Sequence, residues 1–176
     1  MTYLDRTDKH INGYLPTYFD LAAKIGASGV VCELGVERGG SLELWQTLFP
    51  FGSVVGVDIN ETAVWPDGTH RVVMDQASAD LPSALRRLHE SYDLIVDDAS
   101  HDGDATHTSY MRLWPLVTPG HWYVIEDWGV GYPGAPMYDP VMRTFARELV
   151  DDAHFIRDVA SITYRRGLIV IQKTLV

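Results

Sequence analysis

Five short apolar runs, each ending on an acidic residue, are the sequence feature that most restricts how this chain can fold. Segments with apolar residues at helical spacing lie between these runs, so strands and helices alternate along the chain. Such alternation favours right-handed βαβ crossovers and a mostly parallel sheet with helices on both faces, which is a doubly wound α/β fold. In such folds ligands bind at the carboxyl ends of the strands. The acids expected along that edge are Glu33, Asp58, Asp75, Asp97 and Glu126.

The apolar runs and the helical periodicity predict where the elements lie. Strands are expected at residues 30–33, 53–58, 70–74, 92–97 and 122–125. Helices are expected at residues 14–25, 41–48, 79–90, 102–114 and 141–150, with Ser100 as a candidate N-cap. Two final extended runs, 153–159 and 168–174, are expected to be joined through residues 165–167 in a hairpin-like ending. Residues 1–12 indicate a loose arm or a first helical turn, and residues 128–140 a long surface loop.

Length and composition limit the class of protein. The 176 residues are 46% hydrophobic and contain no linker or repeat, which predicts one domain over residues 1–176. A net charge of −10 argues against a nucleic-acid partner, which usually meets a basic face. No signal peptide or membrane span is recognisable, so a cytoplasmic protein without a membrane partner is expected. The one cysteine, Cys32, lies in an apolar run and is expected in the core.

A glycine-punctuated loop follows the first strand and indicates a ligand site. Gly35 and Gly39 allow positive φ angles and close backbone approach before the helix starts near Ser41. Asp58 follows about 20 residues later, where nucleoside sites place an acid on the ribose hydroxyls. The loop lacks the Gly-x-Gly-x-x-Gly order that seats a pyrophosphate, and Glu37 would bring negative charge near phosphates. A nucleoside without phosphates, carrying a cationic or amino group, suits this loop better.

Several motifs together carry a resemblance to a known family. Glu-x-Gly-x-x-x-Gly-x-Ser at 33–41, the acid at Asp58, Asp75-Gln76 and the acidic run at 93–98 resemble a class I S-adenosylmethionine-dependent methyltransferase. More narrowly, Asp97-Asp-Ala-Ser-His101 followed by Val124-Ile-Glu-Asp127 resembles the metal-dependent sugar O-methyltransferases of macrolide biosynthesis, of the macrocin and mycinamicin type, and the related cephalosporin hydroxylases. The resemblance implies a Rossmann-like, mostly parallel, seven-stranded sheet with an antiparallel C-terminal strand.

The resemblance also implies the catalytic and metal-binding residues. Asp98, Glu126 and Asp127 would bind Mg²⁺ or another divalent cation, a role that suits oxygen ligands. His101 would be the general base and Asp98 would share the catalytic work. A sugar-like or polyol-like acceptor could chelate the ion through two hydroxyls, which would lower the pKa of the attacking hydroxyl. The implied activity is Mg²⁺-dependent O-methylation of a small molecule in natural product biosynthesis.

The cofactor roles follow from the same resemblance. Glu33 and the backbone near Gly35 would hold the methionine end of S-adenosylmethionine, and Asp58 would hold the ribose. Asp75 and Gln76 would meet the adenine, while Gly39 and Ser41 shape the helix start. Asp97 would either hold the amino group of the cofactor or orient the metal site, and the sequence leaves both open.

Other interpretations stay open from the sequence. The macrolide enzymes are longer, so only residues 128–140 and the N-terminal arm remain here to shape the acceptor pocket, and a second copy in a homo-oligomer could supply further walls. Asp98 or Asp127 could simply cap a helix, and His101 could be an ordinary loop histidine. The alternative functions are a catalytically silent cofactor-binding partner and a cephalosporin hydroxylase-like component of an oxidoreductase system.

Overall fold

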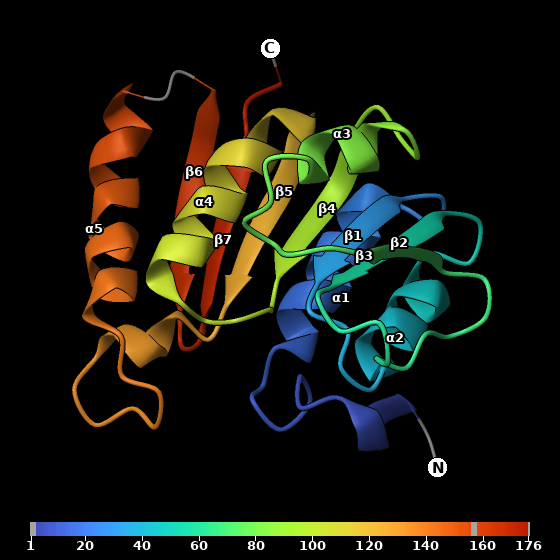
Figure 1. Ribbon diagram of the computed structural model, residues 1–176. Coiled ribbons are helices and arrows are strands. Elements are labelled where there is room, and N and C mark those ends of the chain that lie inside the picture. Colours follow the sequence, from blue (N-terminus) through green and yellow to red (C-terminus); the bar gives the residue numbers. More distant parts are fainter. Residues whose placement is uncertain (1–2, 156–157, 176) are drawn as a thin grey trace.

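The chain forms one seven-stranded sheet, as predicted. A computed structural model describes residues 3–155 and 158–175 and places the strands in the order β3-β2-β1-β4-β5-β7-β6 (Figure 1). Strands β1 to β5 pair in parallel, whereas β7 is antiparallel to both β5 and β6. The strands are β1 (Val30–Leu34), β2 (Ser53–Asp58), β3 (His70–Val73), β4 (Tyr92–Asp97), β5 (Val117–Glu126), β6 (Val159–Arg165) and β7 (Leu168–Lys173). The strand order reverses between β1 and β4, which is where such sheets bind ligands.

Helices cover both faces of the sheet (Figure 1). They are η1 (Tyr3–Arg6), α1 (Leu15–Ile25), α2 (Gly40–Leu48), α3 (Leu81–Arg86), α4 (Gly103–Leu113), η2 (Trp114–Leu116), η3 (Trp128–Gly131) and α5 (Pro140–Phe155). Tyr18 of α1 and Trp45 of α2 pack in the core on one face, while α3, α4 and α5 build the core on the other. Because the central strands are buried on both sides, their sequences are continuous apolar runs.

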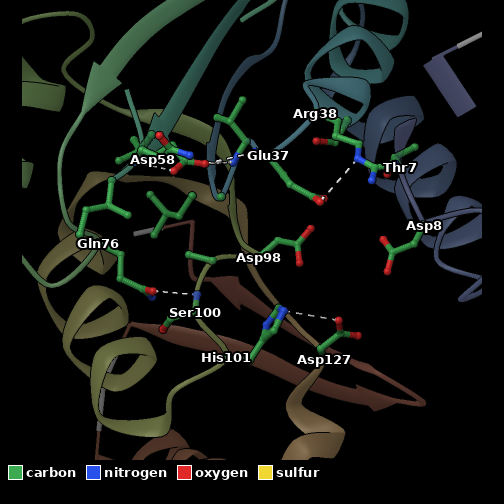
Figure 2. A pocket seen from close by; sticks show the side chains of 18 of the residues that line it. Thr7, Asp8, Glu37, Arg38, Asp58, Gln76, Asp98, Ser100, His101 and Asp127 are labelled. Atoms are coloured by element: carbon green, nitrogen blue, oxygen red, sulfur yellow. Dashed lines mark hydrogen bonds and ion pairs between the residues drawn. The ribbon is translucent and has the colours of Figure 1, made fainter. Parts of the chain in front are cut away.

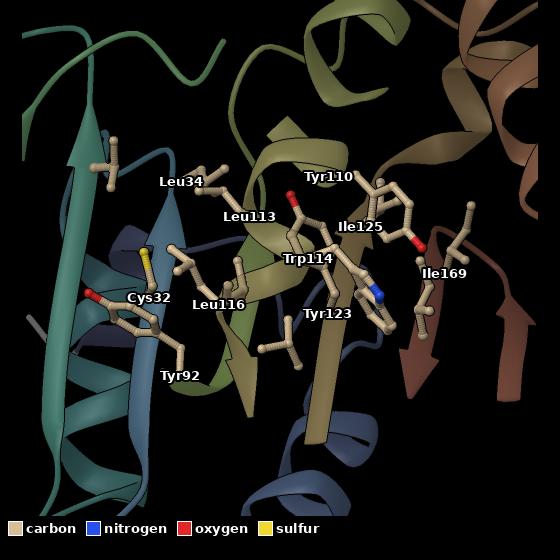
Figure 3. Packing of buried hydrophobic residues seen from close by; sticks show 14 of the residues in the cluster. Cys32, Leu34, Tyr92, Tyr110, Leu113, Trp114, Leu116, Tyr123, Ile125 and Ile169 are labelled. Carbon is tan, nitrogen blue, oxygen red and sulfur yellow. The ribbon is translucent and has the colours of Figure 1, made fainter. Parts of the chain in front are cut away.

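The larger core explains the position of Cys32. Figure 3 shows Cys32 and Leu34 of β1 in the same layer as Tyr92 and as Tyr110 and Leu113 of α4. Cys32 has no exposed surface, as expected for a core residue, and burial raises the pKa of its thiol. None of the helices in the described ranges is both long and apolar enough to cross a membrane.

Four local predictions were wrong. Asp102, not Ser100, is the N-cap of α4, because its side chain accepts a hydrogen bond from the Ala105 N–H at 2.9 Å. Helix α5 continues to Phe155, so the extended run expected at 153–159 is helical over 153–155, while 156–157 lie outside the described residues. The strand of the C-terminal hairpin is therefore β6, which begins at Val159. Helix α3 is shorter than the expected 79–90, and β5 begins earlier than residue 122.

The N-terminal segment, defined here as residues 3–13, is ordered against the body of the protein rather than a loose arm. Its helix η1 packs beside α2 (Figure 1). Arg6 forms an ion pair with Glu43 of that helix. Lys9 is completely buried. The segment therefore adds a wall at the carboxyl edge of the sheet.

Candidate active site

A cavity of about 970 Å³ opens at the carboxyl ends of β1, β2 and β4. Its volume lies in the range of pockets that hold small molecules and cofactors. The N-terminal segment lines one side of it, through Asp5, Arg6, Thr7, Asp8 and Ile11. Predicted site residues on its wall are Gly35, Ser41, Asp58, Asp75, Gln76, Asp98, His101 and Asp127. Figure 2 shows side chains from both halves of the sheet facing this space.

The loop after β1 is shaped by Gly35. Gly35 has a φ of 91°, and a Cβ at this position would lie 2.0 Å from the backbone oxygen of Asp98. Only glycine allows this close approach, so the loops after β1 and β4 touch directly. Gly39, with a φ of 70°, lies off the cavity wall, and a Cβ there would meet the Val64 oxygen at 2.3 Å.

Asp58 ends β2 and is held by backbone donors. Its Oδ2 accepts hydrogen bonds from the N–H groups of Val36 at 2.8 Å and Glu37 at 3.1 Å. Its Oδ1 accepts from the Asn60 N–H at 2.8 Å. The carboxylate is thereby fixed beside the glycine loop, with lone pairs left for hydroxyl donors of a ligand.

Gln76 forms the part of the wall next to β4 (Figure 2). Its Nε2 donates to Asp97 Oδ1 at 3.1 Å and its Oε1 accepts from the Ser100 N–H at 3.0 Å, which fixes the amide. Asp97 itself is 2% exposed and does not line the cavity. It also accepts from the hydroxyls of Ser109 and, at 3.0 Å, Tyr123. Burial raises the pKa of Asp97 to about 6, although these hydroxyls oppose the shift.

Glu33 lies beneath the cavity rather than on its wall. It has no exposed surface, and the indole N–H of Trp45 donates to its Oε2 at 2.9 Å. Burial raises the pKa of Glu33, and the nearby Lys9 ammonium opposes that shift. Its second oxygen, Oε1, lies 3.1 Å from Lys9 Nζ.

Lys9 is the cation at the centre of an inner acidic cluster, a name we use for Lys9 with Glu33, Asp98 and Glu126. Besides Glu33, its Nζ lies 2.7 Å from Asp98 Oδ2 and 2.7 Å from Glu126 Oε1. Burial alone would lower the pKa of Lys9, but the facing carboxylates raise it well above its usual value. The sequence assigned no role to Lys9, since its partners lie far away along the chain.

Two tyrosines of the α1 segment donate to the acids at the end of β5. The Tyr18 hydroxyl donates to Glu126 Oε1, and the Tyr14 hydroxyl donates to Asp127 Oδ1. Burial raises the pKa of Glu126 well above its usual value, and Lys9 opposes the shift. The two tyrosines are four residues apart and share one helix face, a signal that the sequence analysis missed, because a buried phenol needs a hydrogen-bond partner.

Asp98, His101 and Asp127 form an outer face on the cavity wall. Their potential ligand atoms all lie within 4.8 Å of one another, and His101 Nε2 is 3.7 Å from Asp127 Oδ2 (Figure 2). Both His101 and Asp127 have positive φ angles, of 56° and 53°. Such backbone conformations are costly for residues other than glycine and are concentrated at functional sites.

The three predicted metal ligands lie side by side but face different partners. Asp98 belongs to both the inner acidic cluster and the outer face. Asp127 faces the cavity, whereas Glu126 faces Lys9 and Tyr18. Glu126 Oε2 has no hydrogen-bond partner among the described residues although it is buried. Asp98 and Asp127, together with His101, form a group on the cavity wall whose potential ligand atoms lie within 4.8 Å of one another, and carboxylate oxygens suit Mg²⁺; Glu126 does not line the cavity and groups instead with Glu33 and Asp98.

Comparison with known proteins places the chain among methyltransferases. A family described as a methyltransferase domain matches residues 25–128. Mycinamicin VI 2''-O-methyltransferase of Micromonospora griseorubida is 37% identical over 98 residues, which cover 54% of this chain and 25% of that protein. The 8-demethyl-8-(2-methoxy-alpha-L-rhamnosyl)-tetracenomycin-C 3'-O-methyltransferase of Streptomyces olivaceus is 36% identical over 143 residues, which cover 71% of this chain and 36% of that protein.

Solved structures agree with this placement. MycE methyltransferase from the mycinamycin biosynthetic pathway, solved in complex with Mg and SAH, has a TM-score of 0.78 and 26% identity. The match covers 92% of this chain and 49% of that chain. The chain thus spans about a quarter to a third of the curated relatives it matches and about half of the MycE chain. Because the matched domain covers more than half of the sequence, the chain belongs to the methyltransferase domain family.

Proposed function

We propose that this protein transfers a methyl group from S-adenosylmethionine to a hydroxyl of a sugar-like small molecule, with the help of a divalent cation. The observation that carries the proposal is one cavity with a fixed Asp58 on one side and Asp98, His101 and Asp127 on the other. The relatives are named as O-methyltransferases of glycosylated natural products. MycE has been solved with Mg, SAH and mycinamycin VI together.

The cofactor would lie along the carboxyl edge of β1 and β2. Asp58 is placed to accept hydrogen bonds from the ribose hydroxyls, since backbone donors already hold its orientation. The amide of Gln76 and the carboxylate of Asp75 would meet the adenine. Glu33, beneath the wall, would act on the methionine end by its negative charge, with Ser41 at the adjoining helix start.

A divalent ion would be held by Asp98, Asp127 and Glu126. Glu126 fits this set through its free buried oxygen, although its other oxygen is paired with Lys9 and Tyr18. Bound at this place, the ion would lower the pKa of an acceptor hydroxyl and fix its position. Ligand oxygens of Asp98 and Asp127 lie within 4.8 Å of a ring nitrogen of His101, so these acids would orient the acceptor beside it.

His101 would take the proton from the acceptor hydroxyl. Its ring lies on the cavity wall, with Nε2 3.7 Å from Asp127 Oδ2. An imidazole exchanges protons near neutral pH, so it can act as a general base under ordinary conditions.

Calorimetry with S-adenosylhomocysteine tests the proposal, together with a transfer assay on glycosylated macrolides with and without EDTA. We expect binding to the natural chain and a large loss in Asp58→Ala, because the ribose loses its acceptor. Glu61→Gln, which removes an exposed acid nearby, should bind like the natural chain. Transfer should stop in EDTA and return with Mg²⁺. Absence of binding at millimolar S-adenosylhomocysteine would refute the proposal.

A further inference from the structure

The proposed function gives no role to one buried charge, the ammonium of Lys9. Lys9 has no exposed surface, so it does not reach a ligand in the cavity. Burying an ammonium costs free energy unless it is paired and hydrogen-bonded. A buried lysine in contact with three carboxylates therefore needs an explanation beyond packing.

The inner acidic cluster has the composition of a cation site. Glu33, Asp98 and Glu126 come from β1, the loop after β4 and the end of β5, and ligand oxygens of all three lie within 4.8 Å of one another. Two of these acids are fully buried, and unpaired carboxylates at such positions would repel one another. The Lys9 Nζ, at 2.7 to 3.1 Å from all three, stands where a metal ion would otherwise stand.

We propose that the Lys9 ammonium is the built-in cation of the inner acidic cluster and positions Asp98 for the outer face. It excludes a metal ion from the inner cluster, so an exchangeable divalent ion is directed to the cavity side. The ion pair takes Oδ2 of Asp98, which leaves its other oxygen for the cavity. The positioning of Asp98 rests on the proposed function, whereas the exclusion of an inner metal ion does not.

The position of Lys9 in the N-terminal segment has a second consequence, for the shape of the cavity. Lys9 lies in the segment whose residues Arg6, Thr7 and Asp8 line the cavity. The ion pairs of Lys9 therefore also fix one wall of the cofactor pocket. Lys9 therefore does three things. It fixes one wall of the pocket, it contacts Asp98, which belongs to both the inner acidic cluster and the outer face, and it balances negative charge beneath the cavity.

Counting bound Mn²⁺ per chain tests the proposal, by electron paramagnetic resonance of the free ion. Lys9→Met removes the ammonium while keeping an unbranched side chain, and we expect it to bind one Mn²⁺ more than the natural chain. Lys9→Arg keeps the positive charge and should bind the same number as the natural chain. Lys24→Met, at an exposed lysine of α1, is the matched control and should also change nothing.

The melting temperature of Lys9→Met provides a second measurement. We expect the melting temperature of Lys9→Met to fall in EDTA. On addition of Mn²⁺ it should rise by more than the melting temperature of Lys24→Met does. An equal Mn²⁺ count in Lys9→Met and the natural chain would overturn the proposal. If the natural chain binds no Mn²⁺ and Lys9→Met binds one, the divalent ion of the proposed function is refuted while this inference is supported.

A charge-matched variant covers the case in which Lys9→Met does not fold. Lys9→Met/Glu126→Gln removes one positive and one negative charge, so the net charge of the inner acidic cluster is unchanged. We expect it to fold in Mn²⁺ and to bind one ion more than Glu126→Gln alone. Failure of this double variant to fold in Mn²⁺, or an equal count, would overturn the proposal.

Discussion

The inner acidic cluster and the outer face are built from the same kinds of side chain but differ in their access to water. In the cluster, the side chains of Lys9 and Glu33 are 0% exposed and that of Glu126 is 1% exposed. On the outer face, the side chains of His101 and Asp127 are 21% and 29% exposed. Buried charges must be matched by fixed partners, whereas partly exposed ones can accept a ligand. This difference in exposure is why our proposals give Lys9 of the dry group a structural role and place the proton transfer at the wet group.

The His101→Ala substitution should give the largest effect, a loss of activity. It changes a residue of the outer face only. We expect kcat for methyl transfer to drop about 10²- to 10⁴-fold, since a general base contributes that much. The melting temperature should stay close to that of the natural chain, because the side chain is partly exposed. His121→Gln, at a partly exposed histidine on β5, is the control. A normal kcat in His101→Ala would show that another group takes the proton.

The two tyrosines of the α1 segment offer a matched pair that compares the two regions directly. Tyr18→Phe removes a donor from buried Glu126, and we expect a loss of about 1.5–3 kcal/mol in the free energy of unfolding. Tyr14→Phe removes a donor from Asp127, where water can take its place, so the loss should be smaller. Urea unfolding measures both losses. A larger loss for Tyr14→Phe would reverse our assignment of the dry and wet groups.

A pH-dependent effect on stability is expected from Asp97, a buried acid outside the inner acidic cluster. Its pKa of about 6 in the folded state lies above the ordinary aspartate value of 3.8, so the folded state keeps a proton that the unfolded state has released. Stability from this group should therefore be present at low pH and fall as pH rises from about 4 to 6, by at most about 1.4 kcal/mol per pH unit. Asp97→Asn should lack this slope when the free energy of unfolding is measured by urea across that range. Parallel curves for the two proteins would contradict it.

Much of the fold could be predicted from the sequence because its central strands are buried on both faces. Strands such as β4 are therefore continuous apolar runs with an acid at the end, and their alternation with helices dictates a parallel sheet. The position of the first strand of the last hairpin was predicted wrongly for the opposite reason. Most residues of β6 are exposed or half-exposed, so no apolar run marks it, and α5 extends into the segment before it.

The site was predictable only where a sequence motif or the end of an apolar strand marks its residues. Asp98 and His101, three residues apart, do meet Asp127 on one wall. Glu126 faces Lys9 and Tyr18, whereas Asp127 has a positive φ and faces the cavity, and no composition rule indicates that φ angle. Lys9 contacts Asp98 and Glu126 across 89 and 117 residues of sequence, so local patterns could not reveal it.

The positions of Lys9, Tyr14 and Tyr18 affect which part of the chain can be studied on its own. The matched family domain begins at residue 25, yet Lys9, Tyr14 and Tyr18 all precede it. A chain trimmed to that boundary would keep the acids at the ends of β4 and β5 and lose all three groups that neutralise or hydrogen-bond them. The part of the chain recognised by homology is therefore shorter than the set of residues that holds these acids in place, and we expect the excised domain to be less stable than the full chain.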